Sequence, residues 1–274
     1  MALFEAQGLH KRFGDQVVLE GISLRFEEGQ LSGIMGPNGA GKTTCFNVLT
    51  GRYKPERGRV LFAGQDITGL SPREIACRGL SRSFQIMNLF DDDTAIDNIV
   101  IALPAVRDHA WSPLRDLGRD SAAYDAAAQI LARIGLAGKE LTPARRLSYG
   151  ERRALEIGVA LAAQPRILFL DEPTAGLGAE GTARLFDLVA ELKRAIGAPR
   201  AGPARPAPQG GSSKVAEPHL LESIVIIEHD RNFLFRLADK ISVIHWGQVI
   251  AEGSPAALRE NPWVQRSNLG AVAA

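Results

Sequence analysis

A glycine-rich segment at residues 36–44 carries the residue types that bind phosphate, and it directly follows an apolar run at residues 31–35. The segment fits the pattern Gly-x-x-x-x-Gly-Lys-Ser/Thr without a mismatch, which predicts a strand, a phosphate loop and a helix in that order. The loop consists of Gly36, Pro37, Asn38, Gly39, Ala40, Gly41, Lys42, Thr43 and Thr44. Inward-pointing backbone N–H groups, a lysine and hydroxyls at a helix start predict a site for a nucleoside triphosphate with Mg²⁺.

The residue types in this loop follow from the chemistry of phosphate. Gly36, Gly39 and Gly41 let the backbone curl closely around phosphate oxygens, since Cβ atoms would block that approach. Lys42 brings a positive charge to the outer phosphates, and the Thr43 hydroxyl is expected to reach Mg²⁺. Thr44 follows and is expected to hydrogen-bond an inner phosphate. The alternative is a tight glycine turn before a helix, which the complete match to the pattern disfavours.

Two other apolar runs end in residues that could act on a bound phosphate. Residues 167–170 lead into Asp171 and Glu172, and residues 224–227 lead through a glutamate into His229. Open parallel sheets bind ligands at the carboxyl ends of their strands. Asp171 is therefore predicted to join the Mg²⁺ shell, and Glu172 to polarise the attacking water. His229 could hold that water and donate to the γ-phosphate. A solvated acidic pair and a structural histidine are the alternatives.

Four more residues gain meaning only from their context. Ser148 and Gly150 would place a hydroxyl and an N–H group at a helix N-terminus, which predicts either a second anion site or an ordinary capped helix. Gln85 could reach Mg²⁺ or the attacking water, and the alternative is a surface side chain. Phe13 could stack on adenine, and the alternative is a core aromatic residue.

Composition limits the class of protein. The chain has 274 residues, 45% of them hydrophobic and 23% charged, which is ordinary for a globular protein with a sizeable core. The net charge of +1 gives no reason to expect a nucleic-acid partner. Two cysteines are too few for a disulfide framework, and no apolar run is long enough to cross a membrane. With no signal peptide at the N-terminus, a cytoplasmic setting is expected.

The spacing of apolar residues predicts an α/β fold that spans residues 1–274 as a single domain. Residues 1–30 are typical of antiparallel strands, and the continuous apolar runs named above are typical of buried parallel strands. A hairpin is expected around Gly247. The stretch at about 90–160 is mostly helical in pattern and is predicted to form a helical subdomain. Individual helices are expected over residues 42–50, 121–134, 150–163 and 183–196.

Residues 197–218 differ from the rest of the chain. They are rich in Pro, Gly, Ala and Ser and have no apolar period. This composition predicts a flexible insert, whose deletion is expected to leave activity unchanged. A proline-rich motif for a partner is the alternative.

Taken in order, these motifs resemble those of the ATP-binding subunits of ABC transporters over nearly the whole chain. The family's motif positions correspond here to Phe13 (aromatic loop), residues 36–43 (Walker A), Gln85 (Q-loop), 147–151 (signature), 170–173 (Walker B), 175–178 (D-loop) and His229 (H-loop). Within the family, the chain is most similar to the ATPase subunits of bacterial branched-chain amino acid importers. That similarity lies in residues 82–85, 88–90, 171–177 and 227–230, together with the tail from residue 251. Importers for urea or short amides share much of it.

The resemblance implies how such a chain acts. Two ATPase subunits, identical or different, would pair head to tail with ATP between the Walker A loop of one and the signature helix of the other. Ser148 and Gly150 would then contact the γ-phosphate held by the partner, while Glu172 and His229 orient the attacking water. Transmembrane permease subunits would dock near residues 85–90 and hold the chain at the inner face of the cell membrane. A periplasmic binding protein would act indirectly.

Three positions depart from the family pattern. Tyr149 replaces the second glycine of the signature, and Glu151 replaces its glutamine, which brings a negative charge near the phosphate site. Gly178 replaces the aspartate of the D-loop. That change removes a side chain that crosses the dimer interface, which puts communication between the two ATP sites in doubt.

Two other functions fit parts of the pattern. An ATPase subunit of a lipopolysaccharide-type exporter also carries Glu-Arg-Arg after the signature glycine, although the long helical stretch at 100–135 favours an amino acid importer. A non-transport ABC ATPase is disfavoured, because the chain has no long coiled coil, no second ATPase copy and no basic surface. The transported solute is not encoded here, since the membrane subunits and the binding protein select it.

Overall fold

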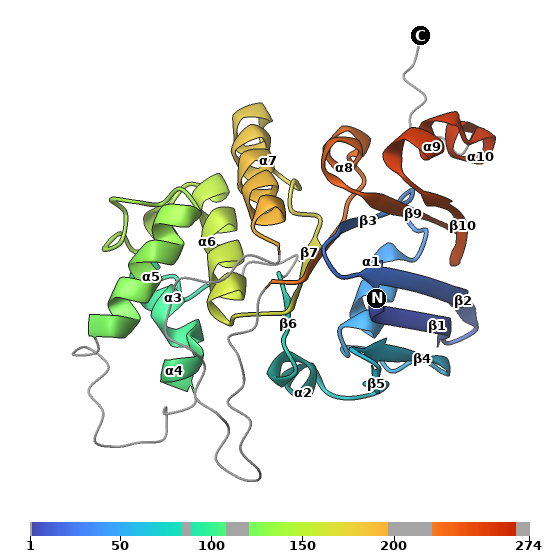
Figure 1. The fold of residues 1–274 in the computed structure, drawn as a ribbon, viewed down its shortest axis with the longest axis horizontal. Helices are drawn as coiled ribbons and strands as arrows, with labels where there is room; N and C mark the ends of the chain where they lie inside the picture. Colours follow the sequence, from blue (N-terminus) through green and yellow to red (C-terminus); the bar gives the residue numbers. More distant parts are fainter. Residues whose placement is uncertain (1, 84–88, 108–120, 197–220, 267–274) are drawn as a thin grey trace.

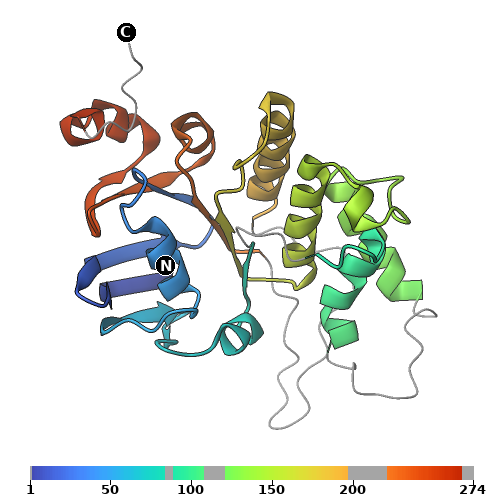
Figure 2. The same ribbon diagram turned by 180° about the vertical axis from the view of Figure 1, so that it is seen from behind.

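The computed structural model describes residues 2–83, 89–107, 121–196 and 221–266. Two β-sheets lie on one side of the molecule, and the helices between residues 95 and 162 lie on the other (Figures 1 and 2). The predicted α/β class is confirmed.

The first sheet is antiparallel and has the strand order β2-β1-β4-β5. The sequence suggested several short runs in residues 1–30, but the structure has two strands of 12 residues, β1 (Ala2–Phe13) and β2 (Gln16–Glu27). Register shifts between the two strands absorb the interruptions of the pattern, including Gly8 with a φ of 57°. The sheet is completed by β4 (Arg57–Phe62) and β5 (Gln65–Asp66).

The second sheet has six strands in the order β10-β9-β3-β8-β7-β6, of which only β10 is antiparallel to its neighbour. Its strands are β3 (Leu31–Met35), β6 (Leu80–Arg82), β7 (Ile167–Asp171), β8 (Ser223–Ile227), β9 (Lys240–His245) and β10 (Gln248–Gly253). Because β3, β8 and β7 are adjacent and parallel, their carboxyl ends meet at one edge. The phosphate loop follows β3 at that edge, and the acidic residues that follow β7 and β8 lie at the same edge.

The helices follow the predicted pattern with small shifts. They are α1 (Lys42–Leu49), α2 (Pro72–Cys77), α3 (Ala95–Ala102), α4 (Pro104–Arg107), α5 (Ser121–Arg133), α6 (Tyr149–Ala162), α7 (Ala179–Arg194), α8 (Arg231–Leu237), α9 (Pro255–Glu260) and α10 (Pro262–Arg266), with a 3₁₀ turn at Ala144–Arg146. Helix α7 begins four residues before the predicted start at 183, directly after Gly178, which gives its cap no side-chain hydrogen bond. Among the described residues no helix is both long and apolar enough to cross a membrane.

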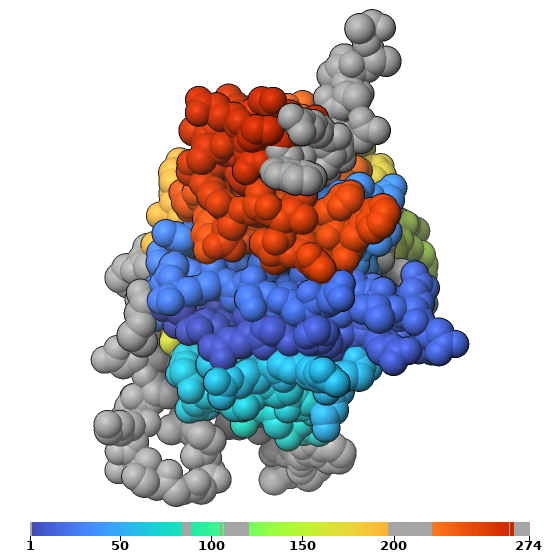
Figure 3. Space-filling model, turned by 90° about the vertical axis from the view of Figure 1, so that its right-hand side faces the viewer, coloured from blue at the N-terminus to red at the C-terminus, as the bar shows by residue number. Residues whose placement is uncertain are grey.

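Alternation of buried side chains along the central strands creates two cores. Leu168 and Leu170 of β7 pack with the helices on one face, while Ile167 and Phe169 pack with α1 and the antiparallel sheet on the other. In the space-filling view, the N-terminal strands in blue form a band between the C-terminal elements in red and orange and the β4–β5 region in cyan (Figure 3). Because neighbouring side chains of β7 pack on opposite faces of the sheet, every residue of this strand is buried, and the end of the strand is held in a fixed position.

Phe169 is the centre of the second core. Its ring lies 5.4 Å from that of Phe4, 6.0 Å from that of Phe26 and 5.9 Å from that of Phe46. The arrangements are edge-on, which is the favourable geometry for aromatic pairs.

Phe169→Ala is expected to lower the free energy of unfolding by about 3–5 kcal/mol, because it removes a ring that three others contact. Urea unfolding followed by circular dichroism measures this change. The matched control is Phe90→Ala, since Phe90 is 56% exposed and its loss should cost no more than about 0.5 kcal/mol. Equal losses for the two variants would contradict the assignment of Phe169 to the core.

Candidate functional site

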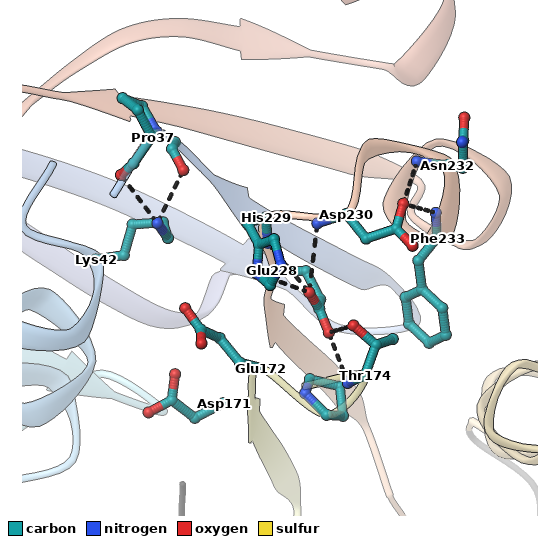
Figure 4. Close-up of polar contacts among 12 residues, drawn as sticks. Pro37, Lys42, Asp171, Glu172, Thr174, Glu228, His229, Asp230, Asn232 and Phe233 are labelled. Carbon is teal, nitrogen blue, oxygen red and sulfur yellow. Dashed lines mark hydrogen bonds and ion pairs between the residues drawn. The ribbon is translucent and has the colours of Figure 1, made fainter. Parts of the chain in front are cut away.

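The phosphate loop joins β3 to α1, as the sequence predicts. Its lysine is only 4% exposed, and its Nζ donates hydrogen bonds to the carbonyls of Gly36 at 2.8 Å and Pro37 at 3.0 Å (Figure 4). Burial lowers the pKa of Lys42, while the charges of Glu172, Asp171 and Glu228 act to raise it. Lys42 therefore lies within the electrostatic reach of both acidic strand ends.

The loop glycines have a reason beyond access to phosphate. A Cβ on Gly36 would lie 2.2 Å from the carbonyl oxygen of Ile244, and one on Gly41 would lie 2.8 Å from that of Val18. Gly39 faces open space but has a φ of 78°, a conformation that side chains with a Cβ rarely adopt. Access of phosphate is therefore one reason for these glycines, and close contact with the protein's own backbone is a second reason at Gly36 and Gly41.

A turn far away in the sequence supports the same loop. The N–H of Gly247, between β9 and β10, donates to the carbonyl of Ala40 at 3.0 Å. Trp246 in this turn is 82% exposed, although its large apolar ring would normally be buried. The predicted hairpin around Gly247 is confirmed. The prediction gives Trp246 no role, although its place in a hairpin turn sets it apart from a core tryptophan.

The remaining loop residues are accessible. Asn38 and Gly39 are exposed, Pro37 and Thr44 are half-buried, and Thr43 is exposed in the first turn of α1. These positions fit the predicted contacts with phosphate and a cation.

The end of β7 is an unusual environment for carboxylates. Asp171 is 4% exposed, and its Oδ1 has no hydrogen-bond partner within the described segments. Burial, with a further contribution from the charge of Glu172, raises the pKa of Asp171 to about 6. Both carboxylates point toward the side on which Lys42 lies (Figure 4). A buried carboxylate oxygen without a partner fits a site that binds a cation or its water shell.

The end of β8 brings a third carboxylate to the edge, and this one is fully buried. Glu228 accepts hydrogen bonds from the N–H of Thr174 at 2.8 Å, from its Oγ1 at 2.5 Å and from the N–H of His229 at 3.1 Å (Figure 4). The side chain of His229 is 54% exposed, with Nδ1 3.6 Å from Glu228 Oε2. His229 is thus anchored through its backbone and accessible at its ring. The sequence predicts no role for Glu228, whose contacts with residues 174 and 229 become visible only in the folded chain.

The predicted signature residues form the start of α6. Ser148 caps the helix: its Oγ accepts from the N–H of Glu151 at 3.4 Å, and Glu151 Oε2 accepts from the N–H of Ser148 at 2.8 Å. Glu151 also forms an ion pair with Lys139. The hydrogen bond from Lys139 lowers the pKa of Glu151 despite partial burial. The negative charge of Glu151, which departs from the family pattern, is therefore paired with Lys139, and the side chain is part of a capping box.

The other two departures differ in their structural roles. Tyr149 donates its hydroxyl to the carbonyl of Ala175 at 3.1 Å and lies over Gly176, where a Cβ would approach Tyr149 Oη to 2.9 Å. Gly178 has ordinary extended backbone and open space around its Cβ position. Packing therefore explains Gly176 but gives no reason for the glycine at 178.

Of the two remaining predicted positions, the structure describes one. Phe13 is 45% exposed at the end of β1, with its ring 5.3 Å from that of Tyr53 and 5.4 Å from Lys11 Nζ, so the alternative of a core aromatic is wrong. Gln85 lies outside the described residues. In the expected docking segment, Leu89 packs against the core and Phe90 is largely exposed.

A strand, a phosphate loop and a helix, with acidic residues at the ends of the neighbouring parallel strands, define a P-loop nucleotide-binding ATPase. The sequence profile of the family described as "ABC transporter" matches residues 19–175. The chain therefore belongs to the ABC transporter family, as one of its ATP-binding cassettes. This confirms the resemblance that the motif order indicated.

Comparison with individual proteins gives the same result. The chain is 36% identical over 273 residues to the high-affinity branched-chain amino acid transport ATP-binding protein LivG of Salmonella typhimurium, which covers 98% of both chains. It is 30% identical over 269 residues to the lipopolysaccharide export system ATP-binding protein LptB of Acidithiobacillus ferridurans, covering 98% of this chain and 97% of that one. A crystal structure of an ATP-binding cassette in its ADP conformation superimposes with a TM-score of 0.77 at 28% identity, covering 98% and 99%.

Asp171→Asn is expected to raise the free energy of unfolding of the nucleotide-free protein at neutral pH by roughly 1–3 kcal/mol. The pKa of Asp171 is about 6 in the folded protein against 3.8 for the ordinary side chain. The folded state thus binds this proton more tightly, and the buried charge costs stability above pH 6. The advantage of the variant should fade between pH 6 and 3.8.

Denaturant unfolding at neutral and acidic pH measures the difference between the variant and the natural chain. Asp15→Asn is the matched control, because Asp15 is fully exposed. A gain for Asp171→Asn that is the same at both pH values would contradict this account.

Proposed function

We propose that this chain is the ATPase subunit of an importer for branched-chain or similar hydrophobic amino acids. The observation that carries the proposal is the 36% identity to LivG, which extends over 98% of both chains rather than over the shared nucleotide motifs alone. The segments that support the assignment include residues outside the phosphate loop, among them 227–230 and the tail from 251.

ATP would be held by the loop from Gly36 to Thr44, with its outer phosphates at Lys42 and its adenine against Phe13. The exposed ring of Phe13 supports that contact. Mg²⁺ fits the same edge, where Thr43 is an exposed residue and Asp171 has a buried oxygen without a partner in the described segments. Gln85 is the third proposed ligand. When bound, the ion would neutralise charge on the phosphate oxygens.

Hydrolysis would use the carboxylate of Glu172 and the ring of His229. Glu172 would accept a proton from water as the water oxygen bonds to the γ-phosphorus, while the bond between that phosphorus and the bridging oxygen breaks and ADP leaves. His229 would orient the water and donate to the γ-phosphate. Its exposed ring and its backbone anchored by Glu228 support that role.

The second half of each site would come from a second ATPase subunit, either identical or related. In a head-to-tail pair, the capped tip of α6 at Ser148 and Gly150 would meet the γ-phosphate held by the partner. The N–H groups of the first helical turn and the helix dipole at this tip favour an anion. Two such sites would form in each pair.

Membrane contact would pass through permease subunits near residues 85–90, where Phe90 presents an exposed ring. The chain would then lie on the cytoplasmic side of the cell membrane, and a periplasmic binding protein would deliver the solute to the permeases. Closure of the ATPase pair would be converted into alternating access of the permeases.

A lipopolysaccharide-type exporter is the second candidate, supported by the 30% identity to LptB over nearly the whole chain. Affinity purification of the tagged chain from its own membranes, followed by identification of the bound subunits, separates the two. Two permeases together with dependence on a periplasmic amino acid-binding protein would support import. Co-purified lipopolysaccharide-transport subunits would overturn it.

Glu172→Gln is expected to abolish ATP turnover while it preserves ATP binding and stabilises the paired state, because it removes the proton acceptor and leaves the phosphate loop intact. Lys42→Ala should instead weaken ATP binding itself. Phosphate release, equilibrium binding and size-exclusion chromatography with ATP measure the three properties. Loss of nucleotide binding in Glu172→Gln equal to that in Lys42→Ala would contradict the proposed role.

Lys139→Ala is expected to weaken ATP-driven pairing about threefold to tenfold, because it leaves the charge of Glu151 unpaired at a helix N-terminus that meets phosphate. The double variant Lys139→Ala with Glu151→Gln should restore pairing, since it removes that charge as well. Sedimentation in the Glu172→Gln background measures the change. Arg25→Ala is the control, because it breaks the exposed ion pair of Arg25 with Glu27 far from α6. Failure of the double variant to recover would refute this charge argument.

A further inference from the structure

One face of α6 is directed at the loop that carries Glu172. Tyr149 and Arg153 are four residues apart, so they lie on the same side of the helix. Tyr149 donates to the carbonyl of Ala175. Arg153 donates to the carbonyls of residues 171–173 in the same loop. The first turns of the signature helix therefore hold the loop of residues 171–175 within the same subunit.

Arg153 makes the denser set of contacts. It is 2% exposed, and its Nη2 donates to the carbonyls of Glu172 at 2.7 Å and Asp171 at 3.1 Å, while its Nε donates to that of Pro173 at 3.3 Å. Its Nη1 donates to Glu156 Oε2 at 2.8 Å. The planar guanidinium can serve several acceptors at once in a fixed geometry, which an ammonium group cannot reproduce.

These carbonyls surround a backbone conformation that needs support. Glu172 has a φ of 43°, which is uncommon for a residue with a Cβ and persists only when its surroundings enforce it. Arg153 contacts the carbonyl of Glu172 itself and of both its neighbours. The direction in which the Glu172 side chain leaves the backbone is thus set partly by α6.

The opposite side of the loop is tied to the strand end that bears His229. Thr174 donates its N–H and its hydroxyl to the buried carboxylate of Glu228, and Glu228 also accepts from the N–H of His229. A continuous series of contacts therefore runs from α6 through the loop to β8. Both groups proposed to orient the attacking water lie on this series.

Ser148, at the tip of the same helix, is the residue proposed to contact nucleotide held by the partner. Little more than one helical turn separates Ser148 from Arg153. The N–H of Arg152 donates a hydrogen bond to the carbonyl of Ser148 at 2.9 Å, which stabilises this turn. A displacement of the tip would therefore be passed to Arg153, because Ser148 caps the same uninterrupted helix of 14 residues and packed helices carry coupling as units.

We propose that Arg153 and Tyr149 are positioning residues that make the orientation of Glu172 depend on α6, so that hydrolysis at one ATP site responds to nucleotide at the other. This inference rests on the head-to-tail pairing of the proposed function. It supplies a route between the two sites within a chain that has Gly178 in place of the family's D-loop aspartate.

The test uses the full chain assembled with its pairing subunit. Arg153→Lys keeps a positive charge for Glu156 but loses the fork that serves three carbonyls. We expect the turnover number to fall about tenfold or more, while the Kd for ATP and the ATP-driven pairing measured in the Glu172→Gln background stay within about twofold. Arg152→Lys is the matched control. That neighbour on the same helix pairs with Asp91 instead of the loop, and its variant should keep the natural turnover number.

Coupling is measured with a double-mutant cycle. If Arg153 transmits the contact made by Ser148, then the losses of turnover from Ser148→Ala and Arg153→Lys should overlap, so that the double variant is little worse than the poorer single variant. Tyr149→Phe removes only one hydrogen bond and should show the same overlap with a smaller loss. If a thermal melt shows that Arg153→Lys does not fold, the double variant of Ser148→Ala with Tyr149→Phe provides the test of coupling.

Two results would overturn the inference. One is a multiplicative loss in the double variants, which would mean that Ser148 and the positioning residues act independently. The other is a parallel loss of ATP binding, pairing and turnover in Tyr149→Phe, which would reveal a purely structural role. A natural chain that neither pairs with ATP nor hydrolyses it would instead disprove the proposed function from which this inference starts.

Discussion

The structure depends on charged groups that are buried close together at the carboxyl edge of its parallel sheet. Three carboxylates, those of Asp171, Glu172 and Glu228, act on the buried ammonium of Lys42, and the guanidinium groups of Arg82 and Arg153 act on Asp171. Glu228 is satisfied by N–H and hydroxyl donors, and Lys42 by carbonyls of its own loop, but Asp171 keeps an oxygen without a partner in the described segments. An edge built in this way is stabilised by whatever brings a cation to the acids and an anion to the lysine and the helix start. A metal–triphosphate complex brings both.

The elements around this edge could be predicted because their signals are local. The apolar runs that became β3, β7 and β8 are continuous, and the phosphate loop has a spacing that few other structures require. The start of α7 was misplaced because its cap, Gly178, offers no side chain to announce a helix. The need for glycine at position 36 was explained only in part, since the carbonyl of Ile244 that a Cβ would strike is distant in sequence. Such contacts appear only once the chain is folded.

The same limit explains the residues that sequence reasoning overlooked. Arg153 and Glu228 are buried charged residues, and besides Glu156 and the hydroxyl of Thr174 their partners include backbone groups that no sequence pattern records. Glu151 illustrates the converse case. Its charge was an apparent fault beside a phosphate site, but Lys139, which lies 12 residues earlier, pairs with it. The effect of a departure from a family pattern therefore has to be judged with its neighbours in space, which a single sequence does not identify.

The buried pair of Arg153 and Glu156 constrains how the signature helix can diverge. Both side chains are at most 5% exposed, and loss of either partner would leave a charge in the interior, which is far more costly than replacing both. Substitutions at these two positions are therefore expected to be inherited together across related chains. A chain that had exchanged the pair for apolar residues would need another way to hold the loop of residues 171–175, and it would mark a lineage in which the support of this loop had been rebuilt.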